Sequence, residues 1–217
     1  MRKRLIRWGL AITIIAGLVF ALAGTWRDPW LWACAILWAG TSLYAITGVD
    51  DDLLKERFRP PESGADSLAL AFVRVFALAL IVLGALDSGR WHLAPVAPAF
   101  RAVGLAGMTA GFLMFFRAMH ENRFFSAVVR VQHDRGHRVV DSGPYSVVRH
   151  PGYAGMLVAM PCAGLALGSF ISFVLGVALS LMVVRRVVVE DAFLREGLEG
   201  YAGYAVRVRH RLVPRVW

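Results

Sequence analysis

Six apolar stretches follow one another along the chain, with polar residues gathered between them. Each stretch is close to the length that a helix needs to cross the hydrocarbon of a bilayer. The pattern therefore predicts an all-α integral membrane protein with five or six transmembrane helices. Only Gly168 and Ser169 separate the last two stretches, which predicts a tight helical hairpin; the count falls to five if either of these is too short to span. The stretches are Leu10–Gly24, Trp30–Gly48, Leu68–Leu86, Phe100–Phe116, Tyr153–Leu167 and Phe170–Val184.

The basic residues lie mainly on one side of these predicted spans. With six spans and a cytoplasmic N-terminus, 20 of the 24 lysines and arginines fall on the cytoplasmic side, and so does the C-terminus. This asymmetry is the positive-inside pattern, so it explains the net charge of +9 without nucleic-acid binding. We expect membrane lipids as partners and no nucleic acid. The Arg- and Ala-rich composition favours a bacterial inner membrane as the location.

The two halves of the chain differ in character. Residues 1–117 are mostly apolar helices with short loops, and the connection between Val49 and Asp66 holds a short amphipathic piece, Asp50–Phe58, followed by Pro60-Pro61. Residues 118–217 contain a long polar segment, the hairpin and a polar tail. Long ordered loops are often functional, so we predict one membrane domain whose chemistry lies in residues 118–217.

The most distinctive motif in the polar segment consists of Gly143-Pro144-Tyr145 and Arg149-His150-Pro151. Gly-Pro makes a turn, and Pro151 suits the first position of a helix, so we predict that a membrane helix begins at His150 or Pro151. The free N–H groups of a helix N-terminus attract anions, and Arg149 and His150 stand beside it. The pair could hold a carboxylate, or it could be a basic turn that only caps the helix.

Arg186 and Glu190 lie four residues apart directly after the last apolar stretch, so they share a helix face. An ion pair in water would contribute little, whereas ionisable groups at a membrane boundary are often functional. If the hairpin forms, it returns this pair to the level of His150.

The histidines of the polar segment include His133 and His137, at a spacing that suits a metal only on a helix. Gly136 and the flanking charges argue against a helix there, so we predict no metal site. The sequence also has no G-x-G-x-x-G, no P-loop and no G-x-S-x-G motif, which argues against a soluble nucleotide-binding fold.

Residues 120–214 together resemble the isoprenylcysteine carboxyl methyltransferase family and the related membrane phospholipid methyltransferases. The resemblance rests on QHDRGHRVVDSGPYSVVRHPGY from Gln132, the hairpin, the Arg-Arg and Glu-Asp pairs, and the tail RVRHRLVP. It implies a pocket for S-adenosylmethionine that faces the cytoplasm, with Arg186 on the acceptor side. The family usually has two adjacent glutamates where this chain has Glu190-Asp191, so the role of Asp191 stays open. The implied cofactor residues are Gln132, His137, Arg138, Val139, Val140, Tyr145, Arg149, His150, Pro151, Gly152, Tyr153 and Glu190.

The function predicted from this resemblance is methyl transfer from S-adenosylmethionine, with S-adenosylhomocysteine as product, to an apolar or lipid-like acceptor such as a prenylcysteine-type carboxylate. Alternative acceptors are a small thiol or a phospholipid amine. A transporter or assembly protein on the same scaffold is a non-enzymatic alternative, although the spans are largely free of charge apart from Arg74. A metal or haem protein that uses the loop histidines is a third possibility. The sequence does not indicate an oligomeric state.

Overall fold

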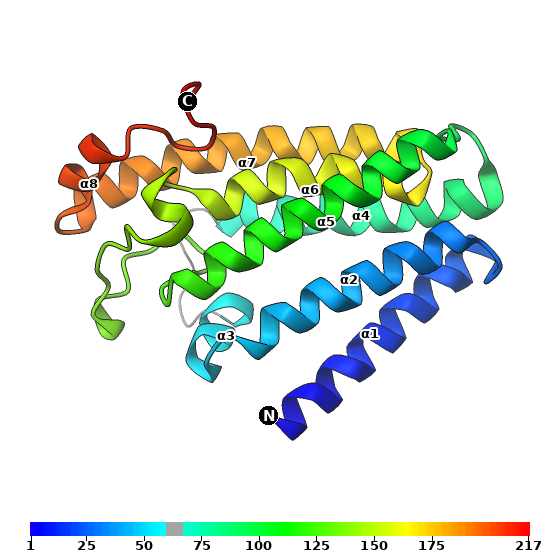
Figure 1. Cartoon of the computed structure of the whole chain (residues 1–217), viewed down its shortest axis with the longest axis horizontal. Helices are drawn as coiled ribbons and strands as arrows, with labels where there is room; N and C mark the ends of the chain where they lie inside the picture. The colour runs from blue at the N-terminus through cyan, green and yellow to red at the C-terminus, as the bar shows by residue number, and fades with distance from the viewer. Residues whose placement is uncertain (60–66) are drawn as a thin grey trace.

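The computed structural model describes residues 1–59 and 67–217, and these form helices joined by loops without a β-strand (Figure 1). The prediction of an all-α protein is confirmed. The predicted Pro60-Pro61 element and the end of its loop at Asp66 lie outside the described residues. The α-helices are α1 (Arg2–Ala23), α2 (Pro29–Thr47), α3 (Asp51–Phe58), α4 (Ser67–Leu86), α5 (Pro98–Glu121), α6 (Pro151–Leu167), α7 (Phe170–Gly197) and α8 (Tyr201–Arg207).

Among the described residues, five helices are long and apolar enough to cross a membrane, namely α1, α2, α4 with its extension to Trp91, α5 and α7. The sixth, α6, has 17 residues and is about 25 Å long at 1.5 Å per residue, slightly less than a hydrocarbon core. The part of the chain that the structure describes is therefore that of an integral membrane protein with five long candidate spans and one shorter apolar helix. Helix α1 begins at Arg2 rather than at the first apolar residues, because its basic residues continue the same helix.

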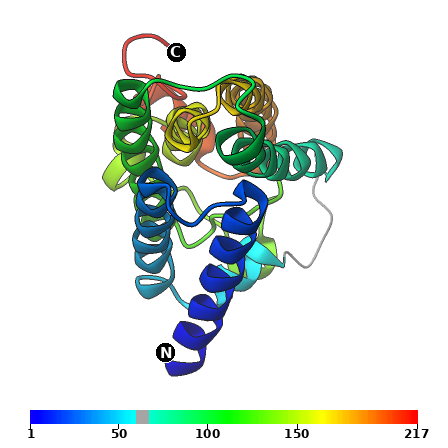
Figure 2. The same cartoon turned by 90° about the vertical axis from the view of Figure 1, so that its right-hand side faces the viewer.

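Small residues allow the central helices to approach closely. A Cβ added at Gly155 of α6 would lie 2.5 Å from the carbonyl oxygen of Gly111 and 2.8 Å from the nitrogen of Phe115, both on α5. A Cβ at Gly176 of α7 would lie 2.5 Å from the carbonyl oxygen of Met160 on α6. Close backbone contact through small residues is a usual way for helices to associate where the solvent is lipid. It holds α6 between α5 and α7, as the end-on view in Figure 2 shows.

The predicted hairpin between α6 and α7 is confirmed. Gly168 ends α6 in the left-handed conformation at φ 88°, which glycine adopts without a Cβ penalty. Ser169 then caps α7 by accepting a hydrogen bond from the backbone nitrogen of Ser172, and its hydroxyl donates to Asp87 at 2.5 Å. This turn lies at the end of the bundle opposite to α3 and α8 (Figure 1).

The polar segments gather at the other end, around α3 and α8 (Figure 1). Helix α3 is fixed there by Glu56, which is 3% exposed and forms an ion pair with Arg130 at 2.8 Å. The C-terminal tail is fixed by backbone bonds, since the nitrogens of Arg149 and His150 donate to His210 and Arg211, each at 2.9 Å. The two halves of the sequence thus meet in one polar cap.

Candidate active site

A cavity of about 1000 Å³, including the space open at its mouth, lies inside this polar cap. Its walls come from α3, the first turns of α4, the end of α5, the segment 122–150, the start of α6, the end of α7 and α8, so both halves of the chain build it.

Helix α6 begins at Pro151 with His150 as its N-cap, as predicted. Gly152 lines the cavity in the first turn of α6 and lets the ring of Phe125 pack closely against this turn, since a Cβ there would lie 2.7 Å from that ring. The N-terminus of a helix therefore borders the cavity and offers it a favourable environment for an anion.

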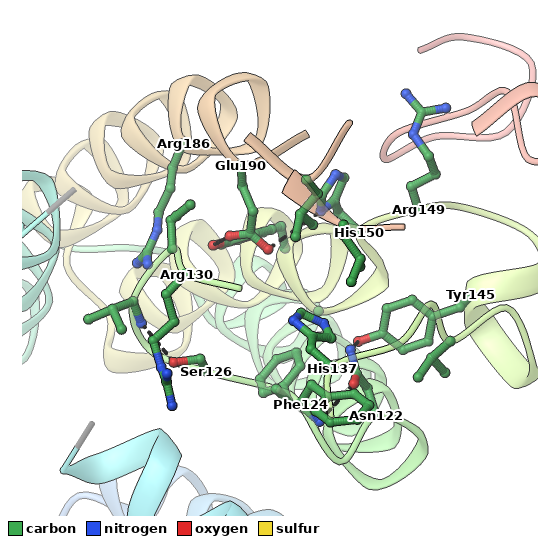
Figure 3. Close-up of a pocket in the computed structure, with 18 of the residues that line it drawn as sticks. Asn122, Phe124, Ser126, Arg130, His137, Tyr145, Arg149, His150, Arg186 and Glu190 are labelled. Atoms are coloured by element: carbon green, nitrogen blue, oxygen red, sulfur yellow. Dashed lines mark hydrogen bonds and ion pairs between the residues drawn. The ribbon is translucent and has the colours of Figure 1, made fainter. Parts of the chain in front are cut away.

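Glu190 is the acidic residue among the described residues that line the cavity, and it lies beside this helix start (Figure 3). The hydroxyl of Tyr153 donates to its Oε2 at 2.5 Å, and Nδ1 of His150 lies 3.9 Å from its Oε1. The hairpin does return Glu190 to the level of His150. A carboxylate held by a tyrosine and a histidine, and still 24% exposed, is suited to bind a cation.

Asp191 points the other way, because successive residues on a helix are about 100° apart. It is fully buried and binds three arginines: Arg149 at 2.7 Å, Arg211 at 3.0 Å and Arg195 at 3.2 Å. The hydroxyl of Tyr201 donates to it at 3.0 Å, and Nε2 of His150 lies 3.4 Å from it. Asp191, whose role the sequence left open, thus joins α6, α7, α8 and the tail.

Arg149 borders the cavity, but its guanidinium is engaged within the protein. Besides Asp191 it donates to the carbonyl oxygens of Val208 and Arg209, at 2.7 and 2.9 Å. Figure 3 shows the side chain directed away from Glu190, toward the C-terminal segment. The capping interpretation of the basic turn therefore fits Arg149 better than direct binding of a carboxylate.

The loop before α6 places His137 in the cavity wall, packed against the ring of Phe124 with 4.6 Å between centroids and a tilt of 33° between the ring planes. Burial, and then the charge of Arg130, lower the pKa of His137 to about 4, so the ring is neutral at neutral pH. Gln132 lies behind this wall and is fully buried, donating to the carbonyl oxygen of Phe124 at 2.7 Å. It supports the loop instead of facing the cavity.

Helix α8 closes the cavity on another side through Tyr201 and Tyr204, which the sequence analysis did not single out. The hydroxyl of Tyr204 donates to the carbonyl oxygen of Tyr145 at 2.8 Å, and Asn122 donates to the hydroxyl of Tyr145 at 3.4 Å. Burial raises the pKa of Tyr145, which keeps its hydroxyl protonated. Two tyrosines three residues apart after Gly200 were the available signal, because that spacing places both on one helix face.

Two arginines stand near the apolar part of the cavity. Arg186 is 6% exposed, donates to the carbonyl oxygen of Ala127 and lies 5.8 Å from the centre of the Tyr153 ring. Arg57, from α3, was not predicted. Burial lowers its pKa to about 10, so it remains protonated at neutral pH.

Most of the predicted site residues come together around this one cavity. Gln132 and Pro151 do not line it: the first lies behind the loop and the second is buried as the first residue of α6. The residues that line it are His137, Arg138, Val139, Val140, Tyr145, Arg149, His150, Gly152, Tyr153, Arg186 and Glu190.

A bundle of membrane helices with one polar, mixed-charge pocket at its end is the architecture of an integral membrane protein built around a small-molecule site. Residues 102–196 match the family model described as the isoprenylcysteine carboxyl methyltransferase (ICMT) family. No curated protein matches the chain. The resemblance inferred from the sequence is confirmed: the chain is similar to this family over the matched residues, and the match supports a membrane methyltransferase.

Proposed function

We propose that the chain is a methyltransferase that binds S-adenosylmethionine in this cavity and transfers its methyl group to an apolar or lipid-like acceptor with a carboxylate. One observation carries the proposal. The same cavity has a carboxylate and a helix N-terminus on its polar side and arginines beside an apolar wall on the other. That combination suits one polar cofactor and one amphipathic acceptor.

The residues present fit S-adenosylmethionine. Glu190, held by Tyr153, suits the cationic ammonium or sulfonium group of the cofactor, and the start of α6 with His150 suits its carboxylate. Val139, Val140 and Leu198 offer an apolar surface for the adenine. When bound, the cofactor supplies a methyl group that is already activated for in-line displacement.

The task left to the protein is to align the two reactants and to exclude water. Alignment alone can lower the barrier by about 7–11 kcal/mol. A carboxylate acceptor is already deprotonated at neutral pH, so it requires no general base, and Arg186 would orient it by a charge-assisted hydrogen bond. A thiol or an amine would have to lose a proton, which makes a carboxylate the simplest acceptor for this set of side chains.

We further propose that the cavity faces the cytoplasm of a bacterial inner membrane, with both termini on that side. The support is the charge pattern: the basic residues of α3, of the segment 117–149 and of the tail all belong to the polar cap. The cap is also the part that a cytosolic cofactor would have to reach.

Calorimetric titration of S-adenosylmethionine and S-adenosylhomocysteine into the detergent-solubilised protein tests the proposal. We expect saturable binding that weakens about tenfold or more in Glu190→Gln, because a charge-assisted hydrogen bond is lost. Glu196→Gln is the matched control, since Glu196 lies on the exposed surface of the same helix. Absence of binding by the unchanged protein at millimolar ligand would refute the function, and equal binding by both variants would refute the placement of the cofactor.

A further inference from the structure

A second cavity lies among the membrane helices, in the half of the bundle away from the polar cap. It encloses about 730 Å³, including the part open to its surroundings. We propose that this cavity binds one acyl chain of a phospholipid from the leaflet away from the polar cap, and that Arg90 holds the phosphate of the same lipid. The inference goes beyond the proposed methyl transfer and does not depend on it.

Five helices, α1, α2, α4, α5 and α6, build the walls of this cavity. Each contributes residues mainly from its half nearer to Gly168, the turn at the end of the bundle opposite to the polar cap (Figure 1). The contribution of α1 has the spacing of one helix face, so this face borders the cavity over about 12 Å, most of the depth of one leaflet. The residues of that face are Ile12, Ile15, Ala16, Val19 and Phe20.

The walls are suited to hydrocarbon and not to water. None of the fifteen described residues that line the cavity carries a charge. The buried side chains of Leu31, Leu80 and Met108 form its inner side. A water molecule in a cavity needs about two to four polar partners, which these side chains do not supply. An alkyl chain would instead gain dispersion contacts with every wall.

The cavity is accessible from the side of the bundle. Ile81 of α4 lines the cavity and is still 37% exposed, and Ile12 and Ile15 of α1 are half-buried. The helices that carry these residues are long and apolar enough to cross a membrane, so the medium beside them is the hydrocarbon of the bilayer. A lipid chain can therefore enter without passing a polar barrier.

The glycines of α1 and α2 explain why space remains beside these helices. A Cβ added at Gly9, Gly17 or Gly40 would have no atom within 4 Å, whereas a Cβ at Gly155 or Gly176 would meet the backbone of a neighbouring helix. The first two helices therefore lack the close backbone contacts that hold α6 in place. A chain in the cavity would add contacts between α1, α2 and the rest of the bundle.

A cation lies just beyond the end of the cavity that faces away from the polar cap. The guanidinium of Arg90 donates to the carbonyl oxygens of Leu22 and Ala21, at 2.7 and 3.0 Å, and Ala21 directly follows Phe20 of the cavity wall. Arg90 is exposed. The exposed ring of Trp32 lies 4.5 Å from that of Phe20, between centroids, and tryptophan is typical of the level where head groups meet hydrocarbon. A phospholipid fits both parts, with its phosphate at Arg90 and a chain in the cavity.

Quenching of tryptophan fluorescence by a brominated lipid tests the inference, because Trp38 lines the cavity. Phosphatidylglycerol with bromine atoms in one acyl chain is titrated into delipidated protein in detergent. We expect a saturable phase of quenching, and Trp38→Phe should lose it. Ala16→Phe should weaken the binding at least about tenfold, because the added ring fills the space of the chain. Ala11→Phe is the matched control, since Ala11 is exposed on the same helix and does not line the cavity.

A second probe tests the role of Arg90. Diacylglycerol with the same brominated chains lacks the phosphate, so it should bind several-fold more weakly than phosphatidylglycerol. Arg90→Gln should weaken binding of phosphatidylglycerol about tenfold and leave that of diacylglycerol unchanged, because only the phosphate loses a charge-assisted hydrogen bond. Arg90→Lys keeps the charge and should retain part of the preference.

Thermal melting checks that each variant is folded, and Ala35→Leu, which fills the cavity from α2, replaces Ala16→Phe if that variant unfolds. Quenching that rises with lipid without saturation, or that is the same in Ala16→Phe and Ala11→Phe, would overturn the inference. Equal affinity for phosphatidylglycerol and diacylglycerol would overturn the assignment of a phospholipid. The titrations contain no methyl donor, so their failure is distinct from a failure of the proposed function.

Discussion

Replacing Asp191 by asparagine removes the charge at the centre of the buried cluster that joins α6, α7 and the tail. The side chains of Asp191 and Arg149 are 0% and 3% exposed, so the guanidinium of Arg149 would remain buried without its counter-charge. Arg195 and Arg211 are 42% and 30% exposed and can turn toward water. The loss of folding stability in Asp191→Asn therefore comes mainly from the buried, unneutralised charge of Arg149.

Breaking one partner of a buried ion pair typically costs about 3–5 kcal/mol. For a chain of this length, 1 kcal/mol corresponds to a change of about 2–4 °C in melting temperature, so we expect Asp191→Asn to melt about 6–20 °C below the unchanged protein. Thermal melting in detergent, followed by tryptophan fluorescence, measures this shift. Glu199→Gln, an exposed acid beyond the end of α7, provides the control.

A double variant tests the cause of the loss. Arg149→Met combined with Asp191→Leu removes both charges, and replacing a buried ion pair by apolar side chains is often close to neutral. The double variant should therefore melt at a higher temperature than Asp191→Asn. The reasoning is refuted if Asp191→Asn melts like the Glu199→Gln control, or if the double variant is no more stable than the single one.

Three further results follow from the structure. Gly155→Leu should destabilise the bundle by about 1–3 kcal/mol or more, because its side chain would meet the backbone of α5; Gly17→Leu on α1, where the space around Cβ is open, serves as the comparison in the same melting assay. The folded state should lose stability as the pH falls from about 6.5 toward 4: the unfolded chain binds a proton at His137 first, while burial keeps the folded pKa near 4. His137→Gln should flatten that part of a plot of stability against pH, and an unchanged plot would contradict the assignment. Tyr153→Phe should weaken binding of S-adenosylmethionine several-fold by calorimetry, since it removes the hydrogen bond to Glu190. An unchanged affinity would show that this bond does not hold the Glu190 carboxylate in position for the cofactor.

The helices and their order were predictable from local signals. Apolar stretches of membrane length mark the spans, Asp28-Pro29 marks the start of α2, and Pro151 marks the start of α6. Gly168 and Ser169 predicted the hairpin, and the hairpin alone was enough to bring Glu190 near His150. These inferences succeeded because each depends on residues that are close in the sequence.

The features of the site that the sequence did not predict depend on contacts between distant segments. Arg57 reaches the cavity through Ser126, 69 residues away, and the sequence contains no local sign of that contact. Glu190 faces the cavity and Asp191 is buried because of the way α7 is rotated against α6. Side-chain packing determines that rotation. Gln132 has the residue type of a ligand-binding group, but its two hydrogen bonds to Phe124 and Arg135 are made inside the loop.

The long separation of these partners also determines when the site can exist during synthesis. Glu56 and Arg130 are 74 residues apart, and Arg149 and Asp191 are 42 residues apart. Because the chain is made from its N-terminus, Glu56 of α3 cannot form its ion pair with Arg130 until the segment after α5 has been synthesised. Glu190 arrives only with the final turns of the last span. A nascent chain that has inserted every helix up to α6 therefore has Arg57 but not yet Glu190, and the pocket is among the last parts of the protein to form.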